Sequence, residues 1–406
     1  MSRLAPWRGL AQWRGLAKVG VERVANRLDA RRFKAASTGN GPVSDGAVAL
    51  YFAVGPENAY QFEQWRRPLE ALATRRPVVV IVDRPDSGRL VLASSTLPVA
   101  FMRASGELES LVERHRIAAV LYVNQVEQNF RMLRFADPVH IQIGHGESDK
   151  GSSVSNQHKA YDVTFIGGPA GRQRLARALY DFDADARIRE VGRPQLDHEY
   201  PGAPDWPEDG RLRVLYAPTW EGDRATIRYG SLVSHGAAII GALRADPRVR
   251  IIYRPHPRIG KASAAHARID REIRASLRAD GDRHLVDLGP YGWQWRFADH
   301  CITDVSAVAY DWLATGKPLA ITEPATGAYR PASALLDSLS LVPADRAGDI
   351  ELLLPLPSAE LAALTRHYFG DITAGASTRR FEAALDEVIS NRQAEIASRT
   401  RTSASE

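Results

Sequence analysis

Hydrophobic residues in the first half of the chain form short runs that alternate with stretches of helical spacing. The runs at 48–54, 78–83, 97–103, 118–123, 139–144 and 161–167 predict strands, and the stretches at 59–75, 107–116, 127–134 and 170–180 predict helices. Strands that alternate with helices in this way form βαβ units and a mainly parallel sheet. We therefore predict a Rossmann-like α/β domain over residues 46–192.

A stretch rich in turn-forming residues then interrupts the pattern. Residues 192–211 contain four prolines and three glycines, which support no long regular element. Strand–helix alternation resumes with strands at 212–217, 249–253, 284–288, 300–303 and 318–322 and helices at 232–245, 262–278 and 307–315. We expect a second α/β domain over residues 210–375, and the carboxyl ends of its strands should face a cleft shared with the first.

The carboxyl-terminal end predicts a long helix followed by a polar tail. We predict a helix over residues 376–397. One arrangement that we consider is that this helix crosses back to pack on the first domain. Residues 398–406 are polar and are expected to be disordered. The chain has no G-x-G-x-x-G after its first strand and no G-x-x-x-x-G-K-[ST], which disfavours a nicotinamide site and a P-loop.

Composition narrows the class of protein. Of the 406 residues, 44% are hydrophobic and 25% are charged, which is ordinary for a globular protein. A single cysteine excludes internal disulfides, zinc ribbons and iron–sulfur clusters. No apolar run approaches the roughly 18 residues of a membrane-spanning helix. We therefore expect a soluble or peripheral protein, and the sequence leaves its oligomeric state open.

Basic residues concentrate in an amino-terminal arm, residues 1–40. The net charge of the whole chain is +5, but residues 1–38 hold nine Lys or Arg against two acidic residues. Apolar side chains from Leu10 to Leu28, Trp13 among them, recur on one helical face. A basic amphipathic helix of this kind is typical of attachment to an anionic membrane surface. Packing on the body or on a partner, or a targeting role, stays open, while nucleic-acid binding is disfavoured.

Two histidines follow predicted strands. His256 lies between two prolines that fix its backbone, and Arg254 comes just before them. An imidazole and a guanidinium at a strand end suit a phosphate or diphosphate. His145 lies between two glycines, and an imidazole with a pKa near 6.5 suits a general base. Glu147 and Asp149 follow closely in the sequence, where their carboxylates could orient the imidazole ring or change its protonation. For both histidines, a turn position without function is the open alternative.

Two further strand ends carry polar candidates. Ser306 lies near the start of the helix at 307–315, where free amides favour an anion, but capping by Asp304 or Ser306 explains the pattern as well. Asp311 is equally consistent with a ligand contact, a solvated residue or an ion pair. Thr219 would line the cleft beside Trp220, which is also suited to plugging the domain interface.

These segments together resemble one family. They are His145-Gly146, residues 192–197 (GRPQLD), 216–220 (YAPTW), 254–257 (RPHP) and 303–306 (TDVS), and Asp311. Their identity and order are similar to those of the CDP-glycerol glycerophosphotransferases, the teichoic-acid primases and polymerases of Gram-positive cell envelopes. The resemblance implies a GT-B fold and transfer of a polyol phosphate, glycerol phosphate first, from a CDP-alcohol to a hydroxyl, with release of CMP.

The resemblance also implies residue roles. His145 would activate the acceptor hydroxyl, and His256 would contact the donor diphosphate. The donor phosphates and nucleotide would be held by Ser306, Asp304, Arg254, Thr219 and Asp311. The acceptor side would include Glu147, Asp149 and Lys150. Two departures from the family pattern lie at Ala307, where a second serine is common, and after Gly146, where the polymerases more usually have Thr-Pro.

The expected partners follow from these roles. They are CDP-glycerol or a related CDP-alcohol, a lipid-linked or glycan acceptor and, through the arm, an anionic membrane surface. The enzyme would work as a peripheral protein at the cytoplasmic face of the cell membrane, without a metal, another cofactor or a nucleic acid. Two alternatives stay open: a GT-B glycosyltransferase that uses a UDP- or GDP-sugar, and a non-catalytic protein that binds membrane surfaces.

Overall fold

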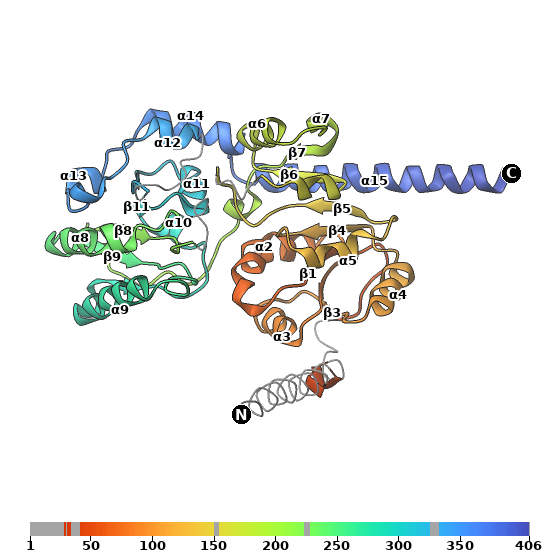
Figure 1. The fold of residues 1–406 in the computed structure, drawn as a ribbon, viewed down its shortest axis with the longest axis horizontal. Helices are drawn as coiled ribbons and strands as arrows, with labels where there is room; N and C mark the ends of the chain where they lie inside the picture. The colour runs from red at the N-terminus through yellow and green to blue at the C-terminus, as the bar shows by residue number, and fades with distance from the viewer. Residues whose placement is uncertain are drawn as a thin grey trace, which may run out of the picture. The chain divides into compact units, whose positions relative to one another are not determined.

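Two parallel β-sheets, of seven and five strands, organise the chain in the computed structural model (Figure 1). The structure describes residues 28–29, 31–33, 41–149, 154–222, 228–324 and 333–405. The chain divides into one unit of residues 1–59, 69–120 and 126–138 and a second of residues 60–68, 121–125 and 139–406. The predicted α/β class with two parallel sheets is confirmed. The expected membrane-binding helix lies largely outside the described residues.

The first unit is built on fully buried strands. They are β1 (Val48–Phe52), β2 (Val78–Val82), β3 (Val99–Phe101) and the start of β4 (Ala119–Tyr122). All residues of β1 and β2 are buried, as expected of a parallel sheet covered on both faces. The strands are connected by α2 (Ala59–Leu72), whose residues 60–68 belong to the second unit, and by α3 (Pro85–Ser94), α4 (Ser105–His115), η2 (Glu127–Asn129) and α5 (Phe130–Leu133). Helix α3 was not predicted; it begins at a proline in the first helical position.

The last described residues of the arm pack on this first unit. Phe33 is buried, and its ring meets Phe101 edge-on with centroids 5.4 Å apart. Gly88 leaves room for the Phe33 ring, which a Cβ at that position would overlap. Arg89 lies 5.6 Å from the centroid of the same ring and pairs with Asp29 at 2.6 Å. The base of the arm is therefore packed on the body, one of the alternatives open from the sequence.

The second unit contains the strands that position the candidate site. They are the end of β4 with β5 (Val139–Gln142), β6 (Val163–Ile166) and β7 (Ile188–Glu190), and the five-stranded sheet of β8 (Leu212–Ala217), β9 (Val249–Tyr253), β10 (Leu285–Val286), β11 (His300–Thr303) and β12 (Leu319–Ile321). The sheet orders are β3-β2-β1-β4-β5-β6-β7 and β10-β9-β8-β11-β12. The second order reverses at β8, and ligands of open α/β sheets bind at such switch points.

The helices of this unit connect its strands and cover its sheets. They are η4 (Asn156–Ala160), α6 (Pro169–Ala178), α7 (Ala184–Arg187), η5 (Pro194–Asp197), α8 (Leu232–Ala245), α9 (Ala264–Ala279), α10 (Gln294–Phe297), α11 (Ala307–Leu313), α12 (Ala334–Ser338), α13 (Ile350–Leu353), α14 (Ala359–Phe369) and α15 (Ala376–Ser405). Within the described part of the chain, no helix is both long and apolar enough to cross a membrane.

The long final helix α15 packs at its start and is exposed at its end. Phe381 lies 6.0 Å from the Phe165 ring of β6 and 5.3 Å from Trp65, between ring centroids. The expectation of a disordered tail at 398–406 differs from the structure, because α15 continues to Ser405. No glycine or proline interrupts the segment, and Glu395 pairs with Arg399 one turn on, which favours helix.

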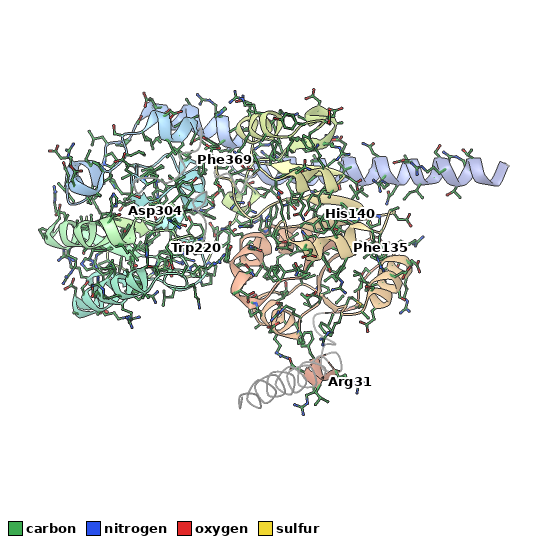
Figure 2. All side chains as sticks on the ribbon, viewed as in Figure 1. Arg31, Phe135, His140, Trp220, Asp304 and Phe369 are labelled. Atoms are coloured by element: carbon green, nitrogen blue, oxygen red, sulfur yellow. The ribbon has the colours of Figure 1, made fainter. Side chains whose placement is uncertain are left out.

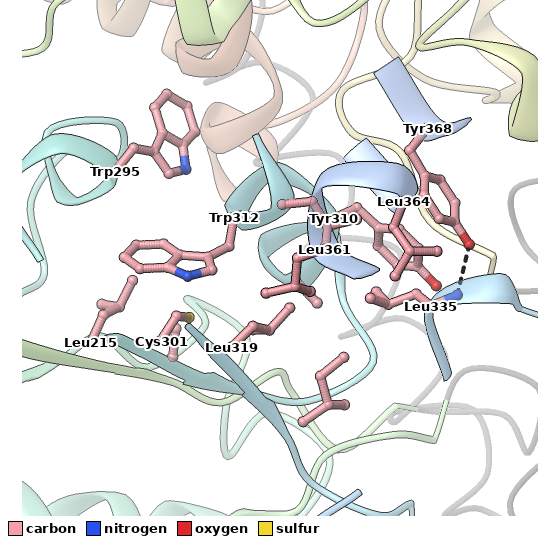
Figure 3. Close-up of a cluster of buried hydrophobic side chains, with 14 of the residues drawn as sticks. Leu215, Trp295, Cys301, Tyr310, Trp312, Leu319, Leu335, Leu361, Leu364 and Tyr368 are labelled. Carbon is pink, nitrogen blue, oxygen red and sulfur yellow. Dashed lines mark hydrogen bonds between the residues drawn. The ribbon is translucent and has the colours of Figure 1, made fainter. Parts of the chain in front are cut away.

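An apolar core joins the five-stranded sheet to helices α11 and α14 (Figure 3). Trp312 of α11 is fully buried, and it belongs to one cluster with side chains of the sheet and of α14, among them Leu215, Leu319 and Leu361. Cys301 of β11 is a buried member, as expected of a core residue, and burial raises the pKa of its thiol. The core therefore holds α11 against the strands whose ends carry the candidate residues.

Candidate functional site

The predicted site residues lie in loops that follow parallel strands of the second unit. His145 follows β5, Thr219 follows β8, His256 follows β9 and Ser306 follows β11. Figure 2 shows the side chains on the ribbon and labels Trp220 and Asp304, which also follow β8 and β11. Because the carboxyl ends of parallel strands share one edge, the loops of the five-stranded sheet lie together at that edge.

One aromatic side chain contacts both candidate histidines. Tyr60, near the start of α2, has its ring centroid 5.5 Å from that of His145 and 5.7 Å from that of His256. Both contacts are edge-to-face, with interplanar angles of 82° and 66°. The sum of the two distances, about 11.2 Å, is the upper limit on the separation of the imidazoles. The structure thus brings together two histidines that are far apart in sequence.

The His145 ring is held in one tautomer by the backbone. Its Nδ1 lies 2.7 Å from the carbonyl oxygen of Val123. A carbonyl only accepts, so Nδ1 carries the proton and the neutral ring has its lone pair on Nε2. Burial lowers the pKa of His145; the hydrogen bond to Val123 opposes this, and nearby Arg193 adds to the lowering. The ring therefore stays neutral to lower pH, in the form that a general base needs.

The His256 ring is held in the other tautomer. Its Nδ1 accepts a hydrogen bond from the backbone N–H of Arg258 at 3.1 Å, so the proton of the neutral ring is on Nε2. The loop after His256 is fixed by Glu221, whose carboxylate accepts from the amides of Gly260 at 3.0 Å and Ala262 at 2.7 Å. One imidazole thus presents a lone pair at Nε2 and the other an N–H.

A buried ion pair ties the loop after β7 to α11 and to the His145 loop. Arg193 and Asp311 have 4% and 0% of their side-chain surface exposed, and they pair through two contacts of 2.8 and 3.1 Å. The same guanidinium donates to the carbonyl of His145 at 3.2 Å and to Gln64. Asp311 was expected at the donor nucleotide, but it is fully buried in this pair. We therefore assign it to positioning, which matches the ion-pair alternative.

The His145 loop also touches the start of α11. A Cβ on Gly146 would lie 2.8 Å from the Cβ of Ala307, closer than such atoms approach in folded proteins. Gly146 is therefore required by the packing of this loop against α11. Ala307, the position where the family commonly has a second serine, lies at this contact.

Asp304 lies beneath the donor loops and holds them together. It is fully buried, and its carboxylate accepts from the Thr219 amide at 2.7 Å, the Thr322 hydroxyl at 2.5 Å and the Ser231 hydroxyl. Burial raises its pKa, and the hydrogen bonds from Ser231, Thr322 and Thr219 act in the opposite direction. In this structure the carboxylate has no exposed surface and is occupied by these loop hydrogen bonds, and a contact of Asp304 with a donor phosphate stays a prediction. Asp304 is a positioning residue.

Ser306 and Thr219 lie at the sheet edge as expected. Ser306 is the residue before α11, and its side chain makes no capping hydrogen bond, so the capping alternative is not what the structure shows. Its hydroxyl lies 3.2 Å from that of Thr303, and its side chain is largely buried. Thr219 is held through its backbone amide by Asp304.

The two arginines of the His256 segment have different surroundings. Arg254 pairs with Asp287 at 2.7 Å, and its guanidinium lies 5.0 Å from the ring centroid of Tyr291. Arg258 lies 3.8 Å over the ring of Trp220, which is buried. Trp220 therefore supports the cation beside His256, a role that the sequence analysis did not assign to it.

The acceptor-side carboxylates face Arg174 of α6. Arg174 pairs with Glu147 at 2.7 Å and with Asp149 at 2.8 Å. Glu147 also accepts from the Gly167 amide at 2.8 Å, and Asp149 from the Tyr368 hydroxyl at 2.5 Å. The hydrogen bond that orients the His145 ring is made by Val123 and not by these carboxylates, and an effect of their charge on the ring stays a prediction. Their part in acceptor binding stays a prediction, and Lys150 lies outside the described residues.

The chemistry available at these loops is that of imidazoles, amides and hydroxyls. Among the described residues, no group of three or more His, Cys, Asp or Glu side chains is placed to hold a metal ion. A lone pair on one imidazole can take a proton from a hydroxyl, and an N–H on the other can stabilise charge on a phosphate oxygen. Tyr60 and Val123 were missed as contributors, because each acts through contacts between separate segments, whereas Arg193 lies in the motif at 192–197 to which no residue role was assigned.

Comparison with known proteins adds a family and a fold. A family model described as CDP-glycerol:poly(glycerophosphate) glycerophosphotransferase matches residues 138–355, more than half of the chain. A variant of the wall teichoic acid polymerase TagF soaked with CDPG is similar in structure, with 14% identity, 95% of this chain and 99% of that chain covered, and a TM-score of 0.56. No curated protein matches in sequence.

Two epimerases share the same fold. A protein described as UDP-N-acetylglucosamine 2-epimerase from Listeria monocytogenes has 11% identity, covers 86% of this chain and 98% of its own, and has a TM-score of 0.56. UDP-GlcNAc 2-epimerase from Neisseria meningitidis, bound to UDP-GlcNAc, has 12% identity, coverages of 84% and 100%, and a TM-score of 0.53. Identities this low show the fold alone, which is GT-B.

Proposed function

From the chain's membership of the CDP-glycerol:poly(glycerophosphate) glycerophosphotransferase family, we propose that it transfers glycerol phosphate from CDP-glycerol to an acceptor hydroxyl and releases CMP. The acceptor is a lipid-linked or glycan hydroxyl in the synthesis of a teichoic-acid-like envelope polymer. The CDPG soak of the TagF variant, which has the same fold, supports a CDP-alcohol as the donor.

The observation that supports this function most strongly is the pair of opposite tautomers. Nε2 of His145 has the lone pair that removes the proton from the acceptor hydroxyl, because Val123 holds the proton on Nδ1. Nε2 of His256 has the proton that donates to a diphosphate oxygen, because the Arg258 amide occupies Nδ1. The two rings therefore meet the separate needs of the nucleophile and the leaving group.

The transfer step is an in-line displacement at phosphorus. The acceptor oxygen forms a bond to the phosphorus that bears glycerol, and the bond from that phosphorus to the bridging oxygen of CMP breaks. The acceptor proton moves to His145 and is then lost to solvent. The electron pair of the broken bond leaves on CMP, where the His256 N–H stabilises the charge.

Buried residues keep this arrangement in place. Arg193 holds the backbone of His145, and Asp311 neutralises that guanidinium. Asp304 fixes Thr219 beside Ser306, the two residues that we assign to the donor phosphates. The reaction needs no cofactor in this scheme. The basic arm keeps the enzyme at the cytoplasmic face of the membrane, next to a lipid-linked acceptor.

The test is CMP release by the purified protein. CDP-glycerol or CDP-ribitol is incubated with acceptor lipid, and wild-type protein is expected to release CMP, whereas His145→Ala and His256→Ala should release none above background. His115→Ala is the matched control, since His115 lies in the first unit, at the end of α4 near Asp45. Release of UDP or GDP from a sugar donor instead would favour a glycosyltransferase. Ligand binding that survives both site substitutions, without turnover of any donor, would favour a binding protein.

A further inference from the structure

Tyr60 is the side chain that links the two candidate imidazoles. Its ring contacts His145 and His256 at centroid distances of 5.5 and 5.7 Å. It lies outside the segment matched by the family model, in the helix predicted at 59–75, to which no functional residue was assigned. A ring that contacts both histidines affects both when it is moved or removed.

Tyr60 is itself fixed by the segment that orients His145. The Gln61 amide donates to the Tyr60 hydroxyl at 3.3 Å and accepts from Asn124 at 2.8 Å. Gln61 and Asn124 are both buried. Asn124 follows Val123, whose carbonyl holds the His145 ring. The same stretch after β4 therefore sets the tautomer of His145 and anchors the helix turn that bears Tyr60.

Helix α2 is also attached to the His145 loop at two further points, the carbonyls of Gly144 and His145. Trp65 donates through Nε1 to the carbonyl of Gly144 at 2.5 Å. Gln64, four residues after Tyr60 and so on the same helix face, accepts from Arg193, which also binds the His145 carbonyl. The distance between the Tyr60 ring and the His145 loop is thus set by several hydrogen bonds.

A hydrogen bond at Nδ1 alone leaves an imidazole freedom to tilt. The torsion that turns a histidine ring has a broad energy minimum, so a ring is oriented well when a second contact restricts it. Tyr60 supplies that contact for His145 and for His256 at once. Phosphoryl transfer depends on such alignment, and a misplacement of about 1 Å lowers a rate roughly 100-fold.

We infer that Tyr60 is a positioning residue for the transfer, whose ring sets the spacing and orientation of both imidazoles. The expected loss of kcat rests on the proposed function. The effect of Tyr60 on the orientation of the two imidazole rings can be measured without turnover. Both histidine contacts are made by the ring, and the hydroxyl adds one long hydrogen bond from Gln61, so removal of the hydroxyl should matter much less than removal of the ring.

The kinetic test compares Tyr60→Leu with Tyr60→Phe. Tyr60→Leu should lower kcat about 100-fold with little change in KM for CDP-glycerol, because alignment and not binding is lost. Tyr60→Phe should restore most of kcat. Tyr180→Leu is the control, since Tyr180 is 85% exposed. Wild-type kcat in folded Tyr60→Leu, or an equal loss in Tyr60→Phe, would overturn the inference.

A second readout separates this inference from the proposed function. Nitrogen–proton correlation spectra of the histidine rings, recorded on the free protein, report tautomer and environment without substrate. Tyr60→Leu should shift the ring signals of both His145 and His256, and unchanged signals would overturn the inference even if the enzyme were inactive. If Tyr60→Leu does not fold, Tyr60→Met is measured in the same way. Shifted rings in a protein that releases no CMP would refute the function and leave the inference standing.

Discussion

The Arg193–Asp311 pair allows a sharp test of how the site is held. Asp311→Asn keeps the shape of the side chain and removes its charge. Arg193 is then left with a buried guanidinium, since 4% of its side-chain surface is exposed and Asp311 supplies two of its hydrogen bonds. Its remaining acceptors are the His145 carbonyl and Gln64, which are uncharged.

The magnitude follows from this burial. Removing one partner of a buried ion pair costs about 3–5 kcal/mol, because the other charge stays buried without compensation. An exposed pair is worth at most about 1 kcal/mol. Arg268 and Glu272 of α9 form such a pair, with 59% and 57% of their side-chain surfaces exposed, so Glu272→Gln is the matched control.

The assay is unfolding in urea, followed by tryptophan fluorescence, for wild type and both variants. Asp311→Asn should lower the free energy of unfolding by about 3–5 kcal/mol and Glu272→Gln by less than about 1 kcal/mol. The double variant Arg193→Met with Asp311→Leu should be less destabilised than Asp311→Asn, because it buries no charge. An Asp311→Asn variant as stable as the control would refute the reasoning.

Three further predictions concern single residues. The lowered pKa of His145 keeps the base unprotonated as pH falls, so the acid limb of the pH profile of kcat/KM should have its midpoint below about 6.5, and a midpoint above that value would contradict the assignment. Gly146→Ala should lower CMP release about 100-fold by displacing the His145 loop from Ala307, whereas Gly106→Ala, with open space around its Cβ, should not; equal activities would count against the packing argument. Asp304→Asn should lower the free energy of unfolding by about 1–3 kcal/mol in urea and raise KM for CDP-glycerol, because it disturbs the hydrogen bonds to Ser231, Thr322 and Thr219; an unchanged stability and KM would remove its positioning role.

The family and the fold class could be predicted from the sequence because both depend on local patterns. The strand at 212–217 and the helix at 232–245 have their predicted bounds in β8 and α8, since short apolar runs and helical spacing are read along the chain. The resemblance to glycerophosphotransferases is confirmed by the family match over residues 138–355. Helix α3 begins at a proline, and no helix was predicted over its segment.

The finer organisation of the site depends on contacts that no local pattern reveals. An aspartate at position 304 or 311 fits a ligand contact or a helix cap equally well from the sequence. The positioning role follows only from the burial of the two side chains and from the groups that they bind in the structure. Glu147 and Asp149 lie close to His145 in sequence, but their side chains turn to Arg174. Tyr60 has no sequence signal, because it meets the histidines only through the fold.

The most direct test of the account follows the phosphorus atom itself. CDP-glycerol labelled with phosphorus-32 at the phosphate next to glycerol is incubated with enzyme and acceptor, and products are separated. If the acceptor attacks this phosphorus, the label appears in the acceptor and the released nucleotide is unlabelled CMP. Label that stays on the nucleotide, as CDP, would show that attack does not occur at that phosphorus and would contradict the proposed transfer.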